Sequence, residues 1–173
     1  MKKVVCFLYG NSNNLKLENN TTIDEYKKLD ENLLKLKEVN DADSLVFSLV
    51  TDDSYEDVRD TKALLDDFFA PPISSRKNFF EEGYINDSSI GLQSGGKCGS
   101  IMDYISEIKK NNEIRHIYYL DDCEFSKEVI SSFITDNNLD DQYTYIPLES
   151  TTTLKETNEL LTYIINNKKM IKK

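Results

Sequence analysis

Three short stretches of this chain carry side chains suited to binding a phosphoryl group. Thr51 follows one apolar run, Lys97 precedes a predicted helix, and Asp121-Asp122 ends another apolar run. A lysine neutralises phosphate oxygens, and carboxylates are ligands for Mg²⁺. We therefore expect Thr51 and Lys97 to contact an anion, and Asp121 and Asp122 to hold a weakly bound Mg²⁺.

Each of these residues also has an ordinary structural explanation. Asp122 can cap the helix that follows it, the hydroxyl of Thr51 can do the same, and Lys97 can be a solvated loop lysine. The first predicted strand, 4–9, ends without an acidic residue, and the first aspartate of the chain is Asp24. The sequence therefore predicts a fold more firmly than an activity.

The elements that must position these residues alternate regularly along the chain. Strands are expected at 4–9, 44–50, within 78–85, 114–120 and 143–148, and helices at about 21–39, 54–69, 98–111, 126–136 and 153–167. The strands are continuous apolar runs, which is typical of a parallel sheet covered on both faces. Ligands of such sheets bind beyond the carboxyl ends of the strands.

These patterns predict an α/β fold: a Rossmann-like, doubly wound, mostly parallel five-stranded sheet with helices on both faces. The length of 173 residues fits a single domain over 1–173. We expect its Lys-rich end, 168–173, to fray.

The order of Thr51, Lys97 and Asp121-Asp122 resembles the haloacid dehalogenase-like (HAD-like) superfamily. Four motifs follow one another in that family: an Asp-x-Asp pair, a Ser or Thr, a Lys, and an acidic pair. The resemblance covers most of the chain and implies a capless member, since no long insertion is visible. It also implies phosphate binding by the Thr and Lys, and Mg²⁺ binding by the acidic pair.

The first motif departs from the family pattern. Placing it on the first predicted strand puts Phe7 and Tyr9 at the two acidic positions. Neither side chain can bind Mg²⁺ or act as a carboxylate nucleophile. The resemblance therefore implies a non-catalytic domain that binds a phosphorylated small molecule or a protein partner at the sheet edge.

Other functions stay open. An active Mg²⁺-dependent phosphohydrolase could take its carboxylates from elsewhere, with Asp52, Asp53, Asp121 and Asp122 as candidates. The stretch 91–98 also fits a Gly-x-x-x-x-Gly-Lys nucleotide-binding loop, with Cys98 in place of the usual Ser or Thr. A scaffold without any ligand is the third alternative. The sequence leaves undecided whether the protein is an enzyme.

Composition narrows the classes of partner and compartment. The net charge of −10 disfavours binding to nucleic acid and to anionic membrane surfaces. No apolar run reaches 18 residues, so no transmembrane helix is expected. Three cysteines without metal-ligand spacing fit a reducing cytoplasm. His116 is the only histidine, and we expect it to be packed or at the surface rather than catalytic.

Overall fold

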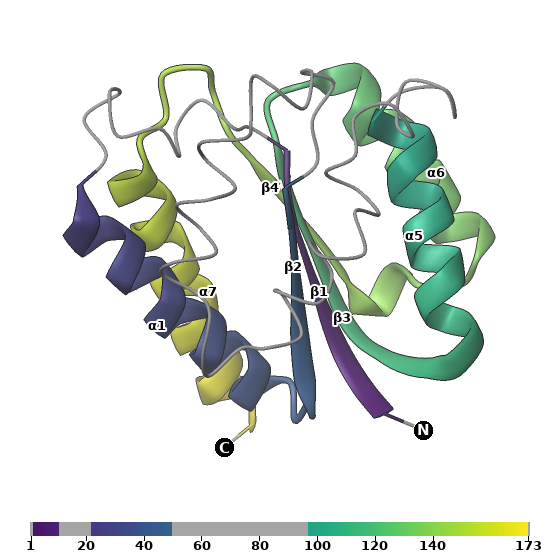
Figure 1. Cartoon of the computed structure of the whole chain (residues 1–173), viewed down its shortest axis with the longest axis horizontal. Helices are drawn as coiled ribbons and strands as arrows, with labels where there is room; N and C mark the ends of the chain where they lie inside the picture. The colour runs from purple at the N-terminus through teal and green to yellow at the C-terminus, as the bar shows by residue number, and fades with distance from the viewer. Residues whose placement is uncertain (1, 11–21, 50–96, 173) are drawn as a thin grey trace.

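The computed structural model describes residues 2–10, 22–49 and 97–172, which form three layers with helices on both faces of one sheet (Figure 1). The elements in chain order are β1 (Lys2–Tyr9), α1 (Ile23–Val39), β2 (Ser44–Leu49), α5 (Lys97–Asn111), β3 (Asn112–Asp121), α6 (Glu124–Asp136), the 3₁₀ turn η3 (Asp140–Gln142), β4 (Tyr143–Pro147) and α7 (Leu154–Lys172). None of the helices in these ranges is long and apolar enough to cross a membrane.

The sheet formed by the described residues is parallel throughout and has the strand order β2-β1-β3-β4. The predicted α/β class and parallel sheet are confirmed. The described sheet has four strands, however, and not the predicted five. The predicted strand within 78–85 and the predicted helix at 54–69 lie outside the described residues.

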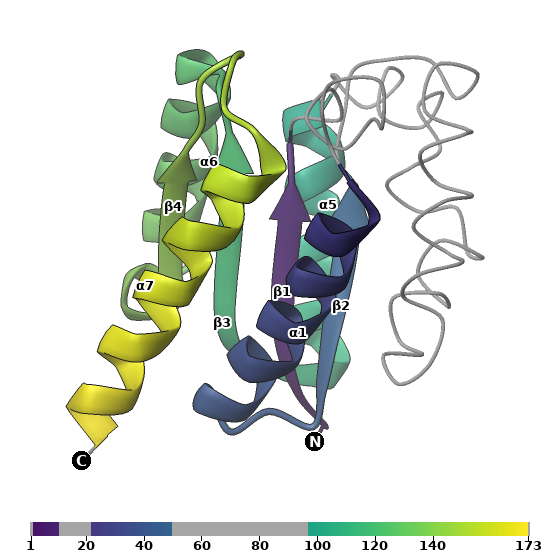
Figure 2. The ribbon, with the colours of Figure 1, turned by 90° about the vertical axis from the view of Figure 1, so that its left-hand side faces the viewer.

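Each strand contributes side chains to two cores because successive residues point to opposite faces of the sheet. Phe7 and Tyr9 of β1 pack in the core beneath α1 and α7, while Cys6 and Leu8 pack in the core beneath α5 and α6. Figure 2 shows α1 and α7 side by side on one face. Burial on both faces explains the continuous apolar runs 4–9 in β1 and 117–120 in β3.

The start of α1 is fixed by a capping box. The hydroxyl of Thr22 accepts from the N–H of Glu25 at 3.4 Å, and the carboxylate of Glu25 accepts from the N–H of Thr22 at 3.2 Å. This confirms the helix start predicted from the sequence at 21–25. Such a cap contributes roughly 0.5–2 kcal/mol to stability.

The end of α7 differs from the expectation. The helix continues through Lys172, past the predicted end at 167 and through most of the tail that we expected to fray. Lys168 is half-buried, and its ammonium donates hydrogen bonds to Asn40 at the end of α1 and to His116 of β3. These contacts hold turns of the helix that composition alone marks as a loose tail.

Candidate functional site at the carboxyl edge of the sheet

The strand order reverses between β1 and β3. From β1 the chain passes to β2 on one side, and β3 then lies on the other side of β1. Open α/β sheets bind ligands at such a switch point, beyond the carboxyl ends of the strands. The helices α5 and α6 both begin at this edge (Figure 1). The carboxyl edge is therefore the candidate site, and Gly10 and Asp121 lie at its centre.

Asp121 is the last residue of β3, and its side chain is fully buried. The hydroxyl of Tyr119 donates a hydrogen bond to Oδ2, and the backbone N–H of Asp122 donates to Oδ1 over 2.8 Å. The backbone oxygen of Asp121 accepts from the N–H of Leu148 at 2.8 Å and from the hydroxyl of Tyr145 at 2.9 Å. Each oxygen of this residue thus already accepts a hydrogen bond within the protein.

Gly10 closes the space between the two strand ends. Its N–H donates to the carbonyl of Leu120 over 2.6 Å, which extends the pairing of β1 and β3 by one residue. A Cβ at position 10 would lie 2.7 Å from that carbonyl oxygen and 2.8 Å from Oδ2 of Asp121. Only a residue without a side chain allows the backbone to approach the carboxylate this closely.

The buried carboxylate dominates the electrostatics of the edge. Burial first, and then the negative charge of Asp121, raises the pKa of Tyr119 above its ordinary value. The same two causes, in the same order, raise the pKa of Tyr145. Both phenols therefore stay protonated at neutral pH, and the Tyr119 hydroxyl remains a donor to Asp121.

Asp122, the second member of the predicted metal pair, is exposed and donates its N–H to Asp121. Within ranges 2–10, 22–49 and 97–172, no three His, Cys, Asp or Glu side chains come together in a way that could hold a metal ion. A magnesium site at Asp121 and Asp122 would thus need a further ligand and a rearranged Asp121.

The other predicted site residues are described only in part. Lys97 is the first residue of α5, so its backbone lies at the carboxyl edge, as predicted from the sequence. Thr51, Asp52 and Asp53 lie outside the described residues, as does the stretch 91–96 of the alternative nucleotide-binding loop.

Phe7 and Tyr9, aligned with the acidic positions of the family's first motif, are core residues. Both are fully buried, and both rings stack on Phe47 of β2, with centroid distances of 5.6 Å and 6.2 Å. They belong to the core beneath α1 and α7, whereas Tyr119, the partner of Asp121, belongs to the opposite core. Side chains at positions 7 and 9 therefore face away from the Asp121 carboxylate.

Two residues of the site, Tyr119 and Gly10, were not predicted from the sequence. Tyr119 precedes Asp121 by two positions, so the two side chains share a face of β3. Once the strand is predicted, this alternation is enough to predict that Tyr119 lies beside Asp121. Gly10 offered no comparable signal, because a glycine after a strand is typical of any turn and its close approach to Asp121 depends on strand order.

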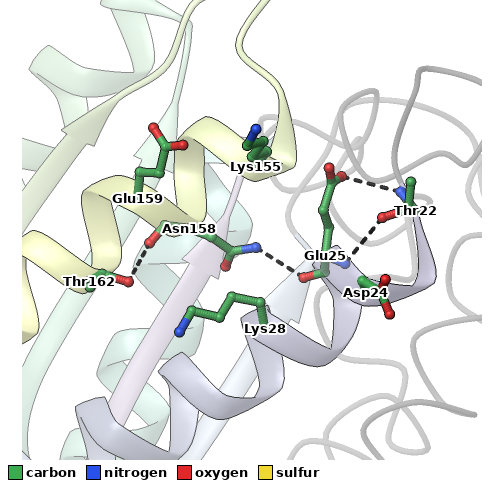
Figure 3. A pocket seen from close by; sticks show the side chains of 8 residues that line it. All are labelled: Thr22, Asp24, Glu25, Lys28, Lys155, Asn158, Glu159 and Thr162. Atoms are coloured by element: carbon green, nitrogen blue, oxygen red, sulfur yellow. Dashed lines mark hydrogen bonds between the residues drawn. The ribbon is translucent and has the colours of Figure 1, made fainter.

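A separate pocket of about 600 Å³ lies between the first turns of α1 and α7 (Figure 3). Its walls are formed by Thr22, Asp24, Glu25, Lys28, Lys155, Asn158, Glu159 and Thr162. Asn158 joins the two helices, because its Oδ1 accepts from Asn32 at 3.2 Å and its Nδ2 donates to the carbonyl of Glu25 at 3.0 Å. The charged residues in the walls are of both signs and favour neither an anion nor a cation.

Comparison of this chain with protein-family models, with curated proteins and with solved structures finds no match. The function of the chain is therefore inferred from the geometry of the carboxyl edge.

Proposed function

We propose that this α/β domain binds a phosphate-bearing small molecule at the carboxyl edge of its sheet, without phosphoryl transfer through Asp121. One observation chiefly supports the proposal. The Asp121 carboxylate is fully buried, and both of its oxygens accept hydrogen bonds, from the Tyr119 hydroxyl and from the N–H of Asp122. A nucleophilic carboxylate must reach phosphorus, and a magnesium ligand must face the ion. Asp121 meets neither requirement in this arrangement.

The first turn of α5 supports an anionic ligand. It begins at Lys97 and contains no acidic residue. By contrast, the first turns of α1, α6 and α7 contain Asp24 and Glu25, Glu124, and Glu156, respectively. The N–H groups of a first turn lack partners within the helix, and the helix dipole favours negative charge there. A phosphate at α5 would supply the charge that acidic side chains supply at α1, α6 and α7.

Thermal unfolding with inorganic phosphate, with and without Mg²⁺, tests this proposal. We expect phosphate to raise the melting temperature of the wild type in the absence of Mg²⁺, and to raise that of Asp121→Asn by a similar amount. The shift should shrink in Lys97→Ala. A ligand at 100 times its dissociation constant adds roughly 2.7 kcal/mol to stability, which is readily measured. Lys110→Ala, at the far end of α5, is the matched control.

Two results would overturn the proposal. A shift that requires Mg²⁺ and disappears in Asp121→Asn, together with hydrolysis of a generic phosphate ester, would indicate an active phosphohydrolase. The absence of any shift with phosphate in the wild type would favour a protein partner instead. Phe125, in the first turn of α6 and 71% exposed, is an apolar side chain near this edge that a partner could cover.

A further inference from the structure

We infer that His116 is a proton-sensitive latch that holds the last turns of α7 against α1 and the sheet. The inference is independent of the proposed phosphate site. It depends on a second group of polar side chains, beneath α1 and α7, which joins β3, β4, α7 and the end of α1.

A β-bulge places the histidine there. Val4 of β1 pairs with Ile114 and Val5 pairs with His116, so Arg115 is the extra residue on β3. The bulge separates residues that would otherwise share a face of the strand. Ile114 packs in the core beneath α5 and α6, while His116 lies on the opposite face, with its ring 4.3 Å from that of Tyr118.

The contacts of the ring define its protonation state. Nδ1 lies 3.4 Å from Nζ of Lys168, and Nε2 lies 2.7 Å from Oγ1 of Thr144. A lysine ammonium can only donate, so Nδ1 must be the acceptor. We therefore assign the ring proton to Nε2, which donates to Thr144 of β4. The imidazole that fits this site is neutral.

Lys168 connects the ring to the end of α1. Its ammonium also donates to Oδ1 of Asn40, the buried C-cap of α1. Nδ2 of Asn40 donates to the carbonyl of Leu36 at 2.8 Å and to the hydroxyl of Tyr118 at 3.0 Å. Lys168 can reach both acceptors only while the last turns of α7 lie against the sheet.

Protonation of His116 would oppose this arrangement. A second proton on the ring would occupy Nδ1 and direct an N–H toward the Lys168 ammonium. The described groups in contact with the ring are Lys168 of α7, Thr144 of β4 and Tyr118 of β3, and none is acidic.

A further positive charge adjoins this group of side chains. Arg115 donates from Nε to the carbonyl of Asn40 at 3.0 Å, and its guanidinium pairs with Glu113 at 3.5 Å. Burial first, and then the charge of Lys168, lowers the pKa of His116 from 6.5 to about 3. The ring would regain its ordinary pKa in water once α7 lifted. Acid therefore favours the lifted form, by up to tenfold per pH unit below about 6.5.

Amide hydrogen exchange, corrected for intrinsic rates, tests the latch. We expect protection in the C-terminal half of α7 to fall progressively between pH 6.5 and pH 4.5 in the wild type. It should stay below that of β1 and β3 at each pH, because α7 lifts without unfolding of the sheet. In His116→Gln, whose amide does not titrate, that protection should not change with pH. Because the chain has one histidine, NMR also reports its titration without ambiguity, and we expect the ring to stay neutral throughout this range.

A second variant guards against failure of His116→Gln to fold. Lys168→Met removes the ammonium that faces Nδ1 and keeps an apolar side chain. We expect it to raise the midpoint of the histidine titration and to weaken the pH dependence in α7. The latch is refuted by equal pH dependence in wild type and variants, or by a wild-type titration near pH 6.5. It is also refuted if protection in α7 equals that in β1 and β3 at every pH, because α7 would then open only with global unfolding.

Discussion

A Cβ on Gly10 would lie 2.7 Å from Cγ of Asp121, closer than packed carbon atoms approach in proteins. The end of β1 therefore contacts the Asp121 carboxylate directly. This contact joins the two strands on either side of the point where the strand order reverses. A substitution at position 10 should therefore displace the Asp121 carboxylate at the candidate site.

Gly10→Ala should lower the free energy of unfolding by about 1–3 kcal/mol, because the added methyl group must displace Asp121 or the Leu120 carbonyl. Denaturant unfolding measures the effect. The cost should be smaller when Asp121→Gly is already present, since part of the clash is then removed. An equal cost in both backgrounds would show that the Asp121 contact is unimportant.

Tyr119→Phe should destabilise the protein by about 1–3 kcal/mol, because it removes the donor to Oδ2 of a buried carboxylate. The matched control is Tyr163→Phe, which removes the same hydroxyl from a side chain that is 66% exposed. In denaturant unfolding, the midpoint of Tyr119→Phe should be lower than that of Tyr163→Phe. Similar midpoints for the two variants would argue against the Asp121–Tyr119 hydrogen bond.

Asn158→Ala should cost about 1–3 kcal/mol, because Asn158 is buried and links α1 to α7 through Asn32 and the carbonyl of Glu25. Asn166→Ala, at an exposed position on the same helix, is the control and should change stability little. A double-mutant cycle with Asn32→Ala should show coupling between the two amides. Additive effects would contradict a direct link.

Global stability should depend on pH through His116. Its pKa is lowered in the folded protein, so the unfolded chain binds the proton more readily, and stability falls as pH drops from about 6.5 toward 3. The slope attributable to this one group is at most about 1.4 kcal/mol per pH unit. Urea unfolding of wild type and His116→Gln between pH 7 and pH 5 gives this slope by difference. Parallel curves would show that carboxylates alone cause the acid sensitivity.

The predicted strands near 4–9, 44–50, 114–120 and 143–148 correspond to β1, β2, β3 and β4 within a few residues. Apolar runs of this length identify buried strands well, because burial on both faces leaves few polar positions. The capped start of α1 was recognisable for a similarly local reason, since Thr22 and Glu25 bond each other within one turn.

The sequence predicted where the candidate site lies, but not how its side chains are arranged. The sequence placed Asp121 at a strand end and Lys97 at a helix start, and both positions are confirmed for the backbone. It did not show that the Asp121 carboxylate is buried and accepts from Tyr119, because burial depends on the neighbouring strand and helices. The roles proposed for Thr51, Lys97 and Asp122 stay predictions.

By itself, the sequence determined the α/β class, the parallel strands and the ends of most described elements, because these follow from local apolar patterns and capping residues. Only the tertiary structure decided the strand order, the contact between Gly10 and Asp121, and the position of Lys168 beside His116. Gly10 and Asp121 are far apart in the chain, as are His116 and Lys168. Pairings at such separations depend on how whole elements pack, which no local pattern specifies.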